Sequence, residues 1–277
     1  MKLHLHLGAH KTATTHFQKV LEVNRCLHPS NISYIKMEQF RNNVRWKDGC
    51  VDFIACGSYL DKVKNSSRTL VISEENLIGY SSDIFSDLFL YSSMENRIKS
   101  LECFTQGFDE IEVWFSIRGM GGFLPSVYCE ALKHGRYRKF EGVYAGNYTQ
   151  IWFPVIQSIC RLFPNSRINV IRYENYTTVL PLVIERFFGK NEGWDYLKDE
   201  RPRSSMNHYA CELMFPFRSV IPGRVSSYLV QRLSRLLNDN NIGHKFAPFN
   251  QKQVDDLLKL YENDIKAIKQ IEQVFVY

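Results

Sequence analysis

LHLHLGAHKTATTHFQ, residues 3–18, is the stretch that decides the fold. Its alternating leucines predict a strand, Gly8 permits a turn, and Lys11 leads into the start of a helix. A cation and hydroxyl groups at a helix N-terminus suit an anion, because the exposed N–H groups and the helix dipole favour negative charge. The hydroxyl groups belong to Thr12, Thr14 and Thr15. This order of strand, turn and helix predicts an α/β protein with a phosphate loop after its first strand.

The spacing of this loop differs from that of nucleotide triphosphatases. Their Walker pattern is GxxxxGK[ST], whereas here only two residues separate Gly8 from Lys11 and no glycine precedes the lysine. The spacing therefore argues against a nucleotide triphosphatase as the first interpretation.

Further apolar segments predict the other strands of a buried parallel sheet. They lie within residues 68–79, 111–119 and 167–176, with a short strand over residues 31–35. Helices are expected over residues 13–25, 83–105 and 147–163, the last with a kink at Pro154. Residues 37–67 are expected to form helical pieces and loop.

An acidic pair, Glu74 and Glu75, follows the strand within residues 68–79. The carboxyl ends of parallel strands face the ligand crevice, so this pair is expected beside the phosphate loop, where a general base is useful. The same residues also suit a helix N-terminus, with Ser73 as cap and the two glutamates complementing the dipole. Both roles can hold at once.

Arg118 ends the strand within residues 111–119, and Ser126 lies eight residues later in a predicted helix that runs to about Gly135. A guanidinium and a hydroxyl are suitable groups for binding a phosphate monoester.

The GxxKTxTT loop followed by the Arg118 and Ser126 pair resembles the sulfotransferases that use 3′-phosphoadenosine 5′-phosphosulfate (PAPS). The sequence of the loop is most similar to that of bacterial members, although Ala13 stands where they usually have glycine. The resemblance covers roughly residues 3–175 and implies a three-layer, P-loop-like fold with a central parallel β-sheet flanked by helices. We expect one domain over residues 1–277, with a helical C-terminal region.

The resemblance also implies roles for the motif residues. Lys11 would stabilise the bridging oxygen of the departing phosphate, with Gly8, Thr12, Ala13, Thr14, Thr15 and the loop amides around the 5′-phosphosulfate. Arg118 and Ser126 would hold the 3′-phosphate, and Arg201, Arg203 or Ser204 would close over it. Glu75, or else Glu74 or His10, would take the proton of an acceptor hydroxyl or amine. The product would be adenosine 3′,5′-bisphosphate.

The acceptor is left open by the sequence. The basic, aromatic segment of residues 135–146 fits a saccharide, so a carbohydrate or glycolipid is expected, although the same residues could admit a lipid headgroup or a phenol. Two alternatives remain: a P-loop small-molecule kinase that uses ATP and a Mg²⁺-binding carboxylate, and a non-catalytic nucleotide- or glycan-binding module.

Composition favours a chain with anionic ligands and reduced thiols. The net charge of +6 is spread along the sequence, so no nucleic-acid arm is indicated. Seven scattered cysteines without a CxxC pair, and no visible signal peptide, predict a cytoplasmic protein. No apolar run approaches the ~18 residues of a membrane span.

Two further features bear on metals and on the C-terminal region. His4 and His6 share one strand face, but no Cys or carboxylate is spaced to complete a zinc site, so packed histidines and no metal are expected. Near the C-terminus, apolar spacing predicts two helices with core-facing stripes. The stripes are Val225, Leu229, Leu233, Leu236 and Leu237 in one helix, and Val254, Leu257, Leu258, Tyr261, Ile265 and Ile268 in the other.

Overall fold

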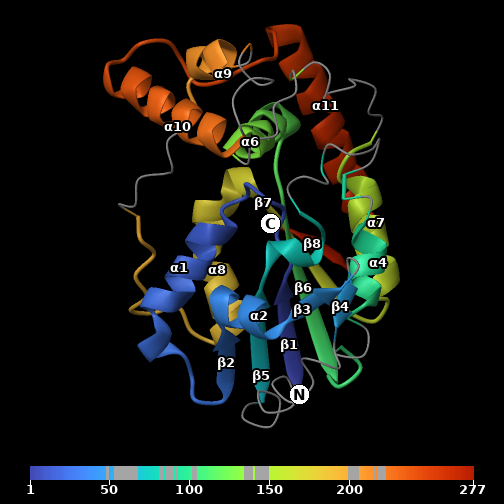
Figure 1. Ribbon diagram of the computed structural model, residues 1–277. Helices are drawn as coiled ribbons and strands as arrows, with labels where there is room; N and C mark the ends of the chain where they lie inside the picture. The colour runs from blue at the N-terminus through green and yellow to red at the C-terminus, as the bar shows by residue number, and fades with distance from the viewer. Residues whose placement is uncertain are drawn as a thin grey trace.

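A six-stranded parallel sheet forms the centre of the molecule in its computed structural model (Figure 1). The structure describes residues 1–47, 50–52, 68–80, 84, 90–91, 93–101, 105–133, 140, 150–198, 206–214, 216 and 223–277. The sheet order is β2-β5-β1-β6-β7-β8. Its strands are β1 (Lys2–His6), β2 (Ile32–Ile35), β5 (Thr69–Ser73), β6 (Glu110–Ile117), β7 (Arg167–Arg172) and β8 (Val274–Val276).

Helices cover both faces of the sheet, as Figure 1 shows. The longer ones are α1 (Thr14–Val23), α6 (Met120–Lys133), α7 (Phe153–Leu162), α8 (Tyr176–Phe188), α10 (Gly223–Asp239) and α11 (Gln251–Ile268). The shorter ones are α2 (Met37–Asn43), α4 (Met94–Lys99) and α9 (His208–Met214), with 3₁₀ turns η1 (Arg25–Leu27), η2 (Glu75–Leu77) and η4 (Tyr173–Asn175). A separate antiparallel pair joins β3 (Arg45–Lys47) to β4 (Cys50–Asp52).

The period-two alternation of β1 divides its side chains between two hydrophobic layers. Leu3 and Leu5 belong to the larger cluster, which includes residues of α4, α6, α7 and α11. His4 stacks on Phe187 of α8 at 4.8 Å, and His6 makes an edge contact with Phe17 of α1 at 4.7 Å. The expected α/β architecture, a central parallel sheet between two layers of helices, is therefore confirmed.

Several local expectations were wrong. The 37–67 segment contains the β3–β4 pair, which was not expected, and a sixth strand, β8, follows α11. Pro154 does not kink α7, because the helix begins at Phe153 and a proline in the first turn gives up no intrahelical hydrogen bond. Within residues 83–105, the expected helix is found at α4, and Ile84 and Thr105 are also helical, whereas residues 85–89 and 102–104 lie outside the described residues.

The expected apolar stripe of α10 is only partly buried. Among its described side chains, Ser226, Val230 and Ser234 are buried, whereas Val225, Leu229 and Leu236 are exposed. On α11 the stripe is buried at Leu257, Tyr261, Ile265 and Ile268, but Leu258 is exposed. Spacing identified the helices but placed the buried face of α10 too far round its axis.

Among the described residues, no helix is long and apolar enough to cross a membrane. Of the described cysteines, Cys26, Cys129, Cys160 and Cys211 are in the thiol form and not in disulfides.

Candidate active site

The carboxyl ends of four neighbouring strands bring the candidate residues together. His6, the last residue of β1, pairs with Ser73 at the end of β5 and with Trp114 of β6. At the other side, Ile117 of β6 pairs with Arg172, the last residue of β7. The segments that follow these strands therefore meet at one edge of the sheet, where parallel α/β sheets bind their ligands.

The loop after β1 has an unusual backbone. Gly8, Lys11 and Ala13 have positive φ angles of 46°, 64° and 69°. Gly8 is required for space as well, since a Cβ there would lie 2.7 Å from Thr14 Oγ1. Ala13 takes the left-handed conformation that glycine adopts at no steric cost, and α1 begins directly after it at Thr14.

Two hydroxyls of the loop hold its shape from within. Thr12 Oγ1 donates to the Ala9 carbonyl at 2.5 Å, and Thr14 Oγ1 lies 3.5 Å from the same oxygen. Both threonines are buried, whereas Thr15 is exposed. The loop backbone is also tied to β6, because the Ala9 N–H donates to the Ser116 carbonyl at 3.3 Å. Thr12 and Thr14 thus stabilise the loop that surrounds the Lys11 backbone.

Arg118 joins the second predicted motif to this loop. Its Nη1 donates to the Lys11 carbonyl at 2.9 Å, and its guanidinium lies 4.3 Å from the centre of the Tyr173 ring. Gly122 leaves room for it, since a Cβ there would lie 3.2 Å from Arg118 Nη2. The Arg118 carbonyl accepts a hydrogen bond from Trp152 Nε1 at 2.8 Å. The strand-end arginine is therefore fixed against the loop that follows β1.

Helix α6 carries Ser126, which is half-buried, and Glu130, one turn further on. Residues four apart lie on the same face of a helix. Glu130 contacts the loop directly, because its Oε2 lies 3.2 Å from Lys11 Nζ. The face of α6 that carries Ser126 is thus turned toward the loop. The N-terminus of the helix is held by Glu174, which accepts a hydrogen bond from the Gly119 N–H at 2.9 Å.

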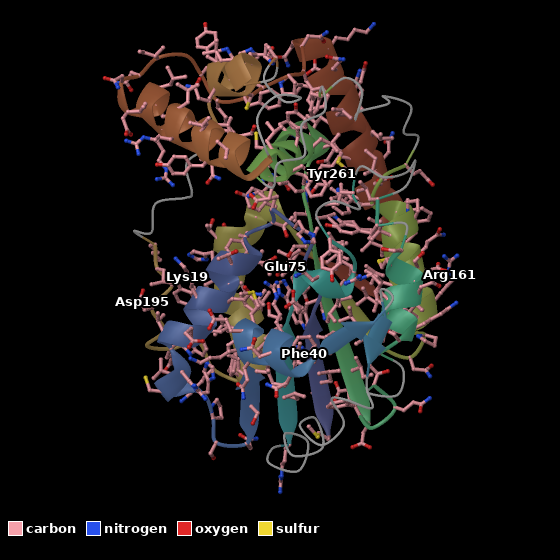
Figure 2. All side chains as sticks on the ribbon, viewed as in Figure 1. Lys19, Phe40, Glu75, Arg161, Asp195 and Tyr261 are labelled. Atoms are coloured by element: carbon pink, nitrogen blue, oxygen red, sulfur yellow. The ribbon has the colours of Figure 1, made fainter. Side chains whose placement is uncertain are left out.

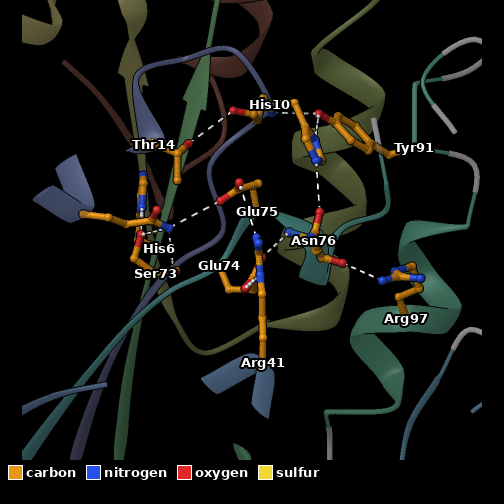
Figure 3. Close-up of polar contacts among 12 residues, drawn as sticks. His6, His10, Thr14, Arg41, Ser73, Glu74, Glu75, Asn76, Tyr91 and Arg97 are labelled. Atoms are coloured by element: carbon orange, nitrogen blue, oxygen red, sulfur yellow. Dashed lines mark hydrogen bonds and ion pairs between the residues drawn. The ribbon is translucent and has the colours of Figure 1, made fainter. Parts of the chain in front are cut away.

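The two glutamates after β5 have different surroundings (Figure 3). Glu74 is buried, and its two oxygens accept hydrogen bonds from Arg41 Nε and Nη2, both at 2.6 Å. Burial raises the pKa of Glu74 above its usual value, and the Arg41 guanidinium offsets only part of this rise. Its Oε1 also accepts from the Asn76 N–H at 2.9 Å. Glu74 is therefore occupied in holding α2 against the sheet edge.

Glu75 is more open than Glu74, with 17% of its side chain exposed. Its Oε2 accepts a long hydrogen bond of 3.4 Å from Gln18 Nε2 of α1, and its Oε1 lies 3.5 Å from Arg41 Nη2. Figure 2 places Glu75 near the middle of the molecule, above the sheet edge. Weak contacts and partial exposure leave this carboxylate more accessible to a bound acceptor than Glu74.

Both ring nitrogens of His10 have partners. Nδ1 lies 3.1 Å from the Tyr91 hydroxyl, and Nε2 lies 3.2 Å from Asn76 Oδ1. The main-chain N–H of His10 also donates a hydrogen bond to the Tyr91 hydroxyl oxygen at 3.0 Å. A histidine held in this way orients the loop and is poorly placed to accept a proton. His16 faces another layer, with Nδ1 at 2.9 Å from the Tyr176 hydroxyl.

Comparison with known proteins gives a distant structural similarity. No family model matches the sequence. No curated protein matches it either. The fold is similar to that of a sulfotransferase from Alicyclobacillus acidocaldarius, with a TM-score of 0.41 and 13% sequence identity over 84% of this chain and 95% of that one.

Several residues that contact the site were not found from the sequence, among them Glu130, Tyr173 and Arg41. Glu130 could have been found from its position one helical turn beyond Ser126, whereas no sequence signal links Arg41 to Glu74. Arg201, Arg203 and Ser204 lie outside the described residues, as does most of the 135–146 segment. Among the described residues, no cluster of three His, Cys, Asp or Glu side chains could hold a metal ion.

Proposed function

We propose that this protein is a PAPS-dependent sulfotransferase that transfers a sulfuryl group to a hydroxyl or amine of an acceptor. The observation that carries the proposal is the hydrogen bond from Arg118 Nη1 to the Lys11 carbonyl. This bond places a loop suited to a 5′-phosphosulfate beside a guanidinium suited to a 3′-phosphate. PAPS carries anionic groups at both positions of its ribose, so its binding requires both sites to lie close together.

The chemistry of the residues fits this donor. The loop offers backbone N–H groups at the start of α1, and Lys11 and Arg118 supply positive charge beside them. Bound PAPS supplies the sulfuryl group. Sulfuryl transfer resembles phosphoryl transfer in requiring positioning and neutralisation of oxygen charge. In this role Lys11 stabilises the oxygen that becomes anionic, while Arg118 and Ser126 hold the 3′-phosphate.

Glu75 is the residue that we assign as general base. Its partial exposure and its weak contact with Gln18 support this choice over Glu74 and His10, whose polar atoms are held more closely. A positioned base of this kind typically contributes ~10²–10⁴ to the rate. We propose a carbohydrate or glycolipid as the acceptor.

Calorimetry with adenosine 3′,5′-bisphosphate, ATP with Mg²⁺, and GTP tests the donor. Binding of the bisphosphate alone supports the proposal, and preference for ATP with Mg²⁺ supports a kinase instead. Absence of binding to all three would remove both enzyme assignments. A screen of labelled sulfate transfer onto polysaccharide, glycolipid and small phenols then identifies the acceptor class.

The variant Lys11→Ala tests the loop in the same transfer assay. We expect loss of transfer with an unchanged unfolding curve. Lys19→Ala is the matched control, because it removes the same charge from an exposed position on α1, which Figure 2 shows on the outside of the molecule. Full activity of Lys11→Ala would show that the loop has been misassigned.

A further inference from the structure

The ammonium of Lys11 is paired with a carboxylate of the protein itself. Lys11 Nζ lies 3.2 Å from Glu130 Oε2, and the two side chains are 25% and 23% exposed. Under the proposed function, this same ammonium neutralises the phosphosulfate of the donor. One cation therefore has two possible anionic partners, and one of them is built into α6.

The backbone and the side chain of Lys11 are held by different groups. Arg118 holds the Lys11 carbonyl, and Glu130 holds the ammonium. A lysine carries its charge on a flexible four-carbon chain, so the ammonium can change partners while the backbone stays in place. Exchange of Glu130 for a bound anion thus needs no rearrangement of the loop.

The position of Glu130 makes the exchange local. Ser126 lies one helical turn before it, on the same face of α6. Under the proposed function, Ser126 contacts the 3′-phosphate, so the donor would lie along the face that carries Glu130. A partly exposed ion pair is weak, and the donor can displace it at small cost.

We propose that Glu130 is a positioning residue: it holds the Lys11 ammonium until the phosphosulfate of the donor replaces its carboxylate. This inference rests on the proposed function. Its consequence is that the affinity for the donor is reduced by the fraction of molecules in which Lys11 is held. No bond is formed or broken in the exchange.

A double-mutant cycle on the full-length protein measures the exchange by calorimetry with adenosine 3′,5′-bisphosphate. Glu130→Gln keeps the shape of the side chain and removes its charge. We expect it to tighten binding about two- to fivefold in low salt, the size of a partly exposed ion pair. In a Lys11→Ala background, Glu130→Gln should leave the affinity unchanged. In transfer assays, Glu130→Gln should lower the KM for PAPS with little change in kcat.

Glu95→Gln is the matched control, since it removes an equal charge from an ion pair elsewhere on the surface. Glu95 Oε1 lies 2.6 Å from Arg161 Nη2, and Figure 2 shows Arg161 on the outer side of the molecule, away from Glu75. This variant should bind the bisphosphate like the wild type. The comparison thereby separates the effect of removing the partner of Lys11 from the effect of changing the net charge of the protein.

Each remaining outcome overturns the inference in a recognisable way. If Glu130→Gln leaves the wild-type affinity unchanged or weakens it, Glu130 does not compete with the donor. If it tightens binding equally in the Lys11→Ala background, its effect does not pass through Lys11. If the wild type binds no bisphosphate, both the proposed function and the proposed exchange are wrong. If the wild type binds it and the double-mutant cycle shows no coupling between Lys11 and Glu130, only the exchange is wrong.

Discussion

Acidification should destabilise this protein through the two buried histidines of β1. Burial lowers the pKa of His4 from 6.5 to about 4 and that of His6 from 6.5 to about 3. For His4, the nearby Glu112 carboxylate opposes this effect without reversing it. Both rings are therefore neutral in the folded protein at pH values where they would be protonated in the unfolded chain.

The sign and size of the effect follow from proton linkage. Below about pH 6.5 the unfolded chain binds more protons than the folded protein, so stability falls as the pH falls until the folded-state values are reached. Each pH unit in this window costs about 1.4 kcal/mol for each histidine. The full slope is reached only well below pH 6.5, so between about pH 6.5 and pH 5 the two rings together should remove about 3 kcal/mol, a large part of the 5–15 kcal/mol of a typical domain.

Urea unfolding followed by tryptophan fluorescence measures this loss, since Trp114 and Trp152 are buried in the two layers. His4→Phe is the informative variant. A phenyl ring can keep the stacking on Phe187 and removes the titrating group. It should roughly halve the pH dependence, because only His6 then titrates.

Two results would refute this reasoning. Equal free energies of unfolding at about pH 7 and pH 5 would mean that the rings are solvated or protonated in the folded protein. An unchanged pH dependence in His4→Phe would mean that other groups carry the effect.

Substitutions at four residues test the site and its support. Asp264→Ala should lower the free energy of unfolding by about 2–3 kcal/mol in urea, because Asp264 accepts hydrogen bonds from the N–H groups of Ile151 and Trp152 at 2.8 and 2.6 Å; Asp264→Asn should lose less. Glu75→Gln should reduce kcat by ~10²–10⁴ with little change in stability, whereas Glu74→Gln should cost about 1–3 kcal/mol of stability; equal effects of the two in both assays would remove the distinction between them. Arg118→Lys should weaken binding of adenosine 3′,5′-bisphosphate about tenfold by calorimetry, since a lysine cannot reproduce the guanidinium fork, and wild-type affinity would exclude Arg118 from the site.

The core of the fold could be predicted from the sequence because it depends on local patterns. Continuous apolar runs identified β5, β6 and β7, and the glycine turn after β1 placed the loop. The β8 strand was missed because a three-residue strand at the end of the chain has little periodicity of its own. Its clues were the β-branched Val274 and Val276, which follow the end of α11 after a short turn segment.

The contacts of the site were harder to predict because most of them join distant segments. The sequence placed Arg118 at a strand end but could not show its hydrogen bond to Lys11. Arg41 and Glu74 form a bidentate pair across 33 residues with no shared pattern. For α10, tertiary packing buried Ser226 and Ser234 and left Leu236 exposed, so hydrophobicity alone gave the wrong face.

The hydrogen bond from Arg118 to the Lys11 carbonyl limits how far the loop can be treated as a portable module. A residue more than a hundred positions away supports a backbone in which Lys11 and Ala13 both have positive φ. Residues 3–18 transplanted into another parallel sheet would carry the lysine and the hydroxyls, but not the guanidinium that holds the turn open. A graft of this loop therefore has to bring the end of β6 with it, and a synthetic peptide of these residues should not bind phosphate.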